Sequence, residues 1–339
     1  MLSGTRIIVI LTLTLAAAAH SQHHLSPREV AENHHISKRC ASAAGSFVQE
    51  RKKRSIAKRN VLMPRNSNVT IHTEGPHFSA IQNNTCIMNP NITPGPYYWP
   101  RSETLRQDMR EDQAGIPLYL DIGVLDTNTC EPAPDVLLDL WHCNATGSYS
   151  SFESLSPNIP FLELLKDRNI TNITDLDLHT DDSTWLRGMW PTDANGVSEL
   201  VTNYPGFYVG RAIHIHVQAH TDWVVRNNGT IVASNLASTG QIYFDEEITE
   251  KIMAMAPYNQ HTEINRTTNS VDLLYPEATK VGWNPNIQIE PLDGVDVANG
   301  MIGYITFGVN VTATSPQVPF LNSTQLSYLL SLESPTPAP

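Results

Sequence analysis

Two histidines stand two residues apart near the middle of the chain, at His214 and His216. Within a β-strand, residues two apart project from the same face. A strand here would direct Ile213, Ile215 and Val217 toward a core and both imidazoles toward the opposite side. Two neutral imidazoles on one face can bind the same metal ion. The spacing therefore predicts a metal site on this strand, and a pair of surface histidines is the alternative interpretation.

Two tyrosines stand beside turns from which a side chain could point toward that strand. Tyr149 follows Gly147 just past a predicted strand end, and Tyr208 follows Pro205-Gly206-Phe207. A phenol has a pKa near ~10, so a phenolate ligand at neutral pH requires a strongly acidic cation. Ferric iron is such a cation, and two phenolates would offset two of its three charges. The tyrosines and histidines together predict a ferric site, whereas either tyrosine alone would be read as a core or loop aromatic.

Short runs of alternating apolar and polar residues, separated by Pro, Gly, Asn and Asp, predict the strands that position these side chains. The pattern is typical of an antiparallel β-sandwich. A helix is expected over 246–255, where Ile248, Ile252 and Met255 recur at helical spacing, and another begins near Ser26. The fold class is therefore mainly β with short helices. The expected strands are 118–125 and 136–141, which we pair as a hairpin, together with 212–220, 241–244 and 301–311.

The charge of the chain is divided unevenly. Of its 339 residues, 22 are Lys or Arg and 34 are Asp or Glu, and residues 1–65 carry a net charge of +8 while the remainder carries −20. The acidic body excludes nucleic acid as a partner, because neutralising phosphates needs clustered Lys and Arg. We expect a basic N-terminal leader or propeptide over 22–85, a catalytic β-sandwich over 86–315 and a Ser/Thr/Pro-rich tail over 316–339.

The N-terminus predicts a secretory signal peptide over residues 1–21. Arg6 precedes an apolar run from Ile7 to Ala19, and Ala19-His20-Ser21 offers a cleavage site. The run is shorter than the ~20 residues that a membrane span needs, so no stable membrane anchor is expected. A secreted, extracellular glycoprotein is also indicated by Asn-x-Ser/Thr sequons at Asn68, Asn83, Asn91, Asn144, Asn169, Asn172, Asn228, Asn265, Asn310 and Asn322.

Four cysteines, none in a C-x-x-C pair, predict two disulfides rather than a metal site. The expected hairpin would place Cys143 beyond disulfide reach of Cys130. Four cysteines allow three connectivities, and of the two that remain we favour Cys86 with Cys143 and Cys40 with Cys130. Dibasic sequences in the leader could be protease processing sites. Because cleavage after Arg54 would leave an odd number of cysteines, we expect the leader to be retained.

Several motifs, taken in order, resemble the intradiol ring-cleavage dioxygenases. The resemblance covers roughly residues 86–311, and the signal peptide and cysteine pattern resemble a secreted, fungal-type branch. Pro94-Gly95-Pro96-Tyr97-Tyr98 resembles the segment before the catalytic domain. The motifs are Gly-x-Tyr-Ser at Tyr149, Arg-Gly-x-x-x-Thr-Asp-x-x-Gly from Arg187, Pro-Gly-x-Tyr at Tyr208, Arg-x-x-His-x-His from Arg211, and Gln-x-Tyr-Phe from Gln241.

The resemblance implies a role for each matching residue. It makes Tyr149, Tyr208, His214 and His216 the ligands of one non-haem Fe(III). It makes Arg211 the cation beside the bound diolate, Gln241 a second-sphere glutamine and Tyr97 a residue at the substrate mouth. It further implies that Tyr208 leaves the metal and takes a proton. O2 then opens the ring between its two hydroxyl-bearing carbons to give a muconate-type product.

Arg211 precedes His214 by three residues, so a regular strand would direct the two side chains to opposite faces. The implied role therefore requires a bend or bulge near Ala212. We expect a secreted dioxygenase that acts on catechol-type diols with O2. The alternatives are a zinc hydrolase in which Asp193 or Glu199 completes the histidine pair, and a non-catalytic module that binds phenolics or polysaccharide.

Overall fold

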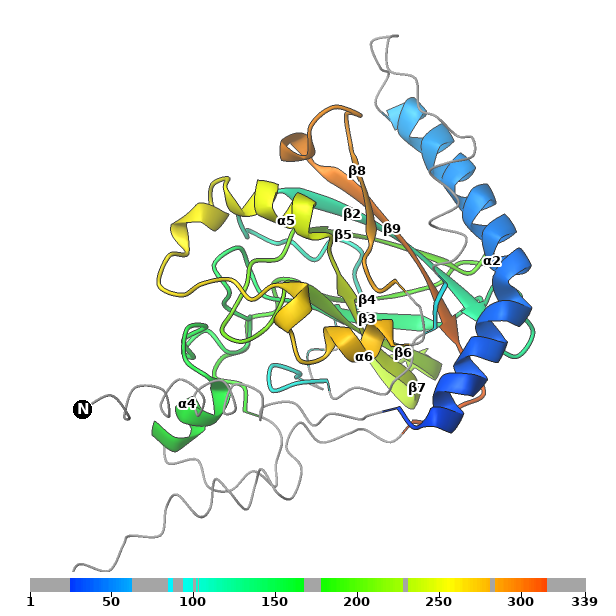
Figure 1. Cartoon of the computed structure of the whole chain (residues 1–339), viewed down its shortest axis with the longest axis horizontal. Helices are drawn as coiled ribbons and strands as arrows, with labels where there is room; N and C mark the ends of the chain where they lie inside the picture. The colour runs from blue at the N-terminus through cyan, green and yellow to red at the C-terminus, as the bar shows by residue number, and fades with distance from the viewer. Residues whose placement is uncertain are drawn as a thin grey trace, which may run out of the picture.

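The computed structural model describes residues 25–62, 85–87, 94–99, 102, 104–167, 178–227, 231–280 and 284–315. Two β-sheets form two layers with a shared core, and one long helix lies along the outside (Figure 1). The predicted signal peptide and the predicted tail lie outside the described residues, as do seven of the ten sequons. None of the helices in these ranges combines the length and apolar character that a bilayer span requires.

Sheet B, which carries the histidines, is antiparallel throughout. Its strand order is β4 (Arg187–Pro191), β3 (Leu137–Trp141), β6 (His214–Val225) and β7 (Ile231–Tyr243). Ile215 and Val217 of β6, and Ile213 just before it, belong to the inter-sheet core, as the alternation predicts. The opposite face of β6 is also buried at its first four polar positions, His214, His216, Gln218 and His220.

Sheet A is mixed. Its order is β1 (Thr85–Ile87), β9 (Met301–Val309), β2 (Pro117–Asp126) and β5 (Val197–Asn203), and β8 (Gln288–Pro291) also pairs with β9. The sandwich is confirmed, but β2 pairs with β9 in parallel. The predicted hairpin between residues 118–125 and 136–141 is wrong, because β2 and β3 lie in different sheets. Long-range pairing with β5 and β9 replaces the local pairing that the sequence suggested.

Helix α2 (Pro27–Leu62) covers the outer face of sheet A. It begins with a capping box, in which the Ser26 backbone N–H donates to Glu29 at 2.8 Å and the Glu29 N–H donates to Ser26 Oγ at 3.3 Å. From its middle, Arg51 reaches the buried Asp121 of β2 at 2.5 Å. A Cβ on Gly123 would lie 1.8 Å from Arg51 Nη1, so a glycine in β2 is what allows the helix to approach.

The predicted disulfide Cys40–Cys130 is confirmed, with 5.1 Å between the two Cα atoms. It ties α2 to the turn that follows β2. The predicted Cys86–Cys143 bond is wrong: Cys143 is a buried free cysteine. The physical reason lies in the topology, since Cys86 belongs to β1 in sheet A whereas Cys143 follows β3 in sheet B.

The remaining helices are short. Helix α5 (Glu246–Met253) confirms the predicted helix and starts at Asp245, whose carboxylate accepts from the Glu247 N–H. The others are α4 (Phe161–Asp167), α6 (Tyr275–Thr279) and the 3-10 turns η1 (Tyr258–Gln260), η2 (Asn269–Val271) and η3 (Val297–Asn299). The segment from α5 to α6 lies over the end of sheet B at which β6 starts (Figure 1).

Candidate active site

The two imidazoles meet at the start of β6. His214 and His216 are 2% and 1% exposed, and their Nε2 atoms lie 3.0 Å apart. His214 Nδ1 is 2.6 Å from the Ala212 carbonyl oxygen, which holds the ring proton on Nδ1 and leaves Nε2 with a free lone pair. Trp141 of β3 stacks on His216, with centroids 4.8 Å apart and planes 4° from parallel. The alternative of two surface histidines is therefore wrong.

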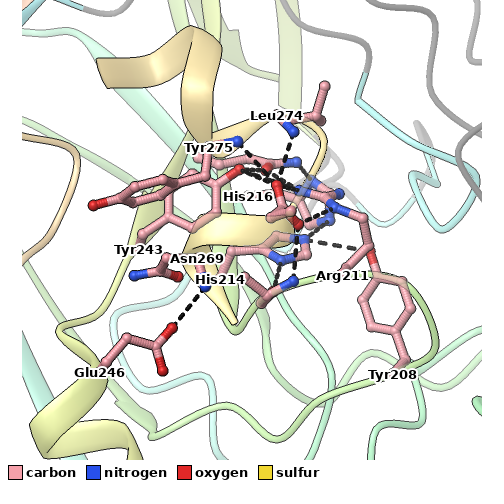
Figure 2. A network of polar contacts seen from close by, with 12 residues as sticks. Tyr208, Arg211, His214, His216, Tyr243, Glu246, Asn269, Leu274 and Tyr275 are labelled. Carbon is pink, nitrogen blue, oxygen red and sulfur yellow. Dashed lines mark hydrogen bonds and ion pairs between the residues drawn. The ribbon is translucent and has the colours of Figure 1, made fainter. Parts of the chain in front are cut away.

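Both predicted tyrosines reach this histidine pair. The Tyr149 hydroxyl lies 3.1 Å from His216 Nε2, and the Tyr208 hydroxyl lies 3.3 Å from His214 Nε2. Figure 2 shows Tyr208 entering from a loop on the side of His214. Four donor atoms from one strand and two loops thus come together, with contacts of 3.0 to 3.3 Å joining each phenol to one imidazole and the imidazoles to each other.

Glycines bring the two tyrosine loops together. Gly147 has φ +90°, and a Cβ there would meet the Phe207 carbonyl oxygen at 2.2 Å. A Cβ on Gly206 would meet the Ala145 carbonyl oxygen at 2.4 Å. In both cases the added Cβ would clash with backbone atoms of the other loop. A larger residue at either position would therefore push the two loops apart and displace a tyrosine. The Gly-x-Tyr and Pro-Gly-x-Tyr motifs therefore set the position of the two phenols.

The donor set fits one metal ion. Atoms bound at about 2.0–2.2 Å to the same ion lie roughly 3 Å from each other, as these atoms do. Burial, together with nearby Arg211, lowers the pKa of His214 to about 3, so its ring is neutral and able to ligate. Burial raises the pKa of both Tyr149 and Tyr208, so they become phenolates only when a cation compensates the charge.

The acidic residues of the zinc alternative are elsewhere. Glu199 lies on β5 in sheet A, in register with Asp121. Asp193 caps a turn by accepting the backbone N–H groups of Asn195 and Val197. Within the described ranges, no three His, Cys, Asp or Glu side chains are grouped to hold a metal ion. The histidine pair is completed by phenols and not by a carboxylate.

Tyr97 closes one side of the site. Its ring stacks on Tyr149 at 4.5 Å between centroids and meets Tyr208 edge-on at 5.6 Å. The buried Arg187 holds this segment, because its Nη2 donates to both the Tyr97 and the Ser150 carbonyl oxygens at 2.8 Å. Tyr97 therefore lies beside both phenols, and its role at the substrate mouth stays a prediction.

Arg211 lies on the other side of the histidines, where the chain bends at Ile213 before β6 begins. This bend supplies the change of direction that the sequence required. The guanidinium Nη2 donates to Gln241 Oε1 at 2.6 Å and to the Tyr243 hydroxyl at 3.1 Å (Figure 2). Gln241 Nε2 is in turn 3.4 Å from His216 Nδ1. Gln241 thus links Arg211 to one of the two imidazoles.

Two residues of this network are not anticipated from the sequence. Tyr243 lies within the Gln-x-Tyr-Phe motif and could have been found there, because it shares a face of β7 with Gln241. Asp272 pairs with Arg211 Nε at 2.8 Å from a segment without regular structure. It stands in no motif, so no spacing signal could have identified it.

Comparisons with known proteins identify the family to which the chain belongs. The family model described as "Dioxygenase" matches residues 91–268. An intradiol ring-cleavage dioxygenase from Tetranychus urticae is 26% identical, with a TM-score of 0.53, and the match covers 68% of this chain and 98% of that one. A second dioxygenase crystal structure gives 26% identity, a TM-score of 0.52 and the same coverage.

The dioxygenase domain of a carbohydrate-binding fusion protein from a cellulolytic Streptomyces is 22% identical, with a TM-score of 0.39 over 66% of this chain and 98% of that one. No curated protein matches the chain by sequence. The family match covers more than half of the chain and includes all the site residues predicted from the sequence. The chain is an enzyme of the intradiol ring-cleavage dioxygenase family, whose members use O2 to open catechol-type rings.

Proposed function

We propose that this enzyme is a secreted dioxygenase that holds one non-haem Fe(III) and cleaves catechol-type diols between the two hydroxyl-bearing carbons, giving muconate-type products. One observation carries the proposal. Two imidazole nitrogens and two phenol oxygens converge within 3.0 to 3.3 Å of their neighbours in a fully buried site. This set combines two neutral donors with two donors that become anionic, as a ferric ion favours.

The side chains around the metal position have separate tasks. His214 and His216 would bind through Nε2, and Tyr149 and Tyr208 would bind as phenolates after each loses its hydroxyl proton. The chemistry that ferric iron supplies when bound is chelation of a catechol dianion and its activation toward O2. Tyr208 Oη would accept a proton that the substrate hydroxyl gives up. Arg211 would stabilise negative charge on the substrate ring, and Tyr97 would form one wall of the space that the ring occupies.

A spectroscopic and kinetic experiment tests the metal and the reaction together. The purified protein is analysed for iron, its visible spectrum is recorded, and catechol is added under air while product is followed by ultraviolet absorbance. We expect about one iron per chain, a phenolate-to-iron band in the visible and loss of catechol. A colourless protein that stays inactive after ferric reconstitution would refute the proposal, as would stoichiometric zinc.

Tyr208→Phe gives a sharper test, with Tyr204→Phe as its matched control. Tyr204 is equally buried and four residues away, but its hydroxyl contacts Thr249 at 2.7 Å and not the histidines. Tyr208→Phe should weaken the visible band and lower kcat by about 100-fold or more, the scale on which single catalytic groups contribute. Tyr204→Phe should keep both. Equal spectra and rates in the two variants would show that Tyr208 is not a ligand.

Secretion is supported by three features. The N-terminal sequence is that of a signal peptide, Asn265 and Asn310 are exposed sequon residues, and a disulfide joins Cys40 to Cys130. Expression in a secreting host should therefore yield protein in the medium whose mass falls after enzymatic removal of N-glycans. Retention of an unglycosylated chain inside the cell would contradict this part. The fungal-type branch stays a prediction.

A further inference from the structure

Asp272 is a buried carboxylate that contacts the site from outside the segment matched by the family model. It lies in the loop between η2 and α6, and its side chain has no exposed surface. Its Oδ2 accepts from Arg211 Nε at 2.8 Å, and its Oδ1 lies 3.5 Å from Nη2 of the same guanidinium. The two side chains therefore meet edge to edge, the arrangement that fixes a guanidinium plane.

The carboxylate itself is held by backbone groups. The Ala212 N–H donates to Oδ2 at 2.8 Å, and the Leu274 and Tyr275 N–H groups donate to Oδ1 at 2.8 and 2.9 Å (Figure 2). Three donors from two chain segments leave the carboxylate little freedom to rotate. Asp272 is thus a fixed support against which the longer and more flexible Arg211 side chain is oriented.

The opposite charges of Arg211 and Asp272 also favour a supporting role for the carboxylate. A guanidinium that is 2% exposed has lost most of its contact with water and is stable in its charged form only beside a counter-ion. The pair keeps Arg211 charged while its far edge is directed to Gln241 and Tyr243, on the histidine side.

We infer that Asp272 is the positioning residue of this enzyme's reaction, holding the Arg211 guanidinium in the plane and location from which it acts on the bound diol. The inference rests on the proposed function, because it assigns to Arg211 the stabilisation of charge on the substrate. Asp272 forms hydrogen bonds with Arg211 and with the Ala212 N–H, and the Ala212 carbonyl oxygen in turn contacts His214 Nδ1. Iron content and the visible spectrum therefore distinguish an effect through Arg211 from one through His214.

A double-mutant cycle tests this route. The variants are Asp272→Asn, Arg211→Gln and the pair combined, and kcat and KM for catechol are measured together with iron content and the visible spectrum. Asp272→Asn should lower kcat by roughly 10- to 100-fold, the loss typical of a misplaced catalytic group, while iron and colour are kept. In the Arg211→Gln background the same substitution should change kcat by less than about threefold, because the group it positions is already absent.

The matched control is Glu246→Gln. Glu246 accepts from the Asn269 N–H at 2.6 Å and pairs with Arg266 at 2.6 Å, so it supports the same loop without contacting Arg211. It should keep wild-type kcat. If Asp272→Asn does not fold because it leaves Arg211 unpaired, kcat is compared between Arg211→Gln, in which the Asp272 carboxylate keeps its three backbone donors, and the combined variant, in which neither charge remains. A difference of more than about threefold between these two would overturn the inference.

The outcomes separate two failures. Wild-type protein that binds iron but does not cleave catechol would refute the proposed function. An active wild type with an Asp272→Asn variant of unchanged kcat, or with equal losses in both backgrounds, would overturn the inference alone. Loss of iron from Asp272→Asn would also overturn it, because the residue would then act on the metal site.

Discussion

The buried pair between Arg51 and Asp121 allows a quantitative test of how α2 is attached. We consider Arg51→Met, which keeps an unbranched apolar side chain about as long as the aliphatic part of arginine and removes the guanidinium. In the native protein the guanidinium also donates to Thr306 Oγ1 and to the Ile305 carbonyl oxygen, each at 2.9 Å. The substitution leaves the Asp121 carboxylate, 6% exposed, without its partner.

The expected loss follows from that unpaired charge. Burial lowers the pKa of Arg51 and raises that of Asp121, so desolvation outweighs their mutual attraction. Breaking such a pair from one side costs about 3–5 kcal/mol, whereas removing both charges is often nearly neutral. At 2–4 °C per kcal/mol for a chain of this size, Arg51→Met should lower Tm by roughly 6–20 °C. Arg51→Met combined with Asp121→Asn should recover most of that loss.

The loss should also depend on pH. Without Arg51, the pKa of Asp121 in the folded state stays above the unfolded value of ~3.9. A raised carboxyl pKa costs stability when the group is ionised, and the cost disappears below the unfolded pKa. The deficit of Arg51→Met should therefore be full at pH 7 and shrink as the pH falls toward about 4.

Thermal unfolding with the Cys40–Cys130 disulfide intact measures these effects, and Lys53→Met serves as the matched control. Lys53 is 65% exposed and pairs with the exposed Glu50, so its loss should cost less than about 1 kcal/mol. The reasoning about the buried pair is refuted if Arg51→Met and the Lys53→Met control have the same Tm at pH 7. It is also refuted if adding Asp121→Asn to Arg51→Met does not raise Tm.

Two further predictions concern the covalent tie and the tyrosine loops. Cys40→Ser should lower the free energy of unfolding by about 2–5 kcal/mol, because the bond to Cys130 closes a span of 90 residues. Denaturant titration measures this loss, and wild-type protein treated with dithiothreitol serves as the comparison. Gly147→Ala should reduce iron content along with stability, because its Cβ would meet the Phe207 carbonyl oxygen and displace Tyr149. Full iron loading at unchanged Tm would contradict it.

Local features of the chain were predictable. The alternation around His214 directs both imidazoles to one face whatever lies beyond the strand, because side-chain direction in a strand depends only on the backbone. The capping box at Ser26 and the helix that begins at Glu246 are equally local and match the structure. The motif order then supplied the two tyrosines, Gln241 and Arg211.

Partners far apart in the sequence were not predictable in the same way. The strands 118–125 and 136–141 look like a hairpin because they are neighbours in the sequence, yet β2 pairs with β5 and β9 in the other sheet. The same error led to the expected Cys86–Cys143 bond. Alternating residues show which face of a strand is buried, but they do not show which strand lies beside it.

The sequence by itself determined the donor types of this site, the strand that bears the histidines and the glycine turns that precede both tyrosines. The family resemblance implied that Tyr149 and His216 share a metal ion, and the tertiary structure supplied the contact between them across 67 positions. Only the tertiary structure decided that Asp272 supports Arg211 across 61 positions. The reason is physical: a motif fixes the direction of its own side chains through local backbone geometry. A contact between distant segments depends on the packing of the whole core, to which every strand contributes.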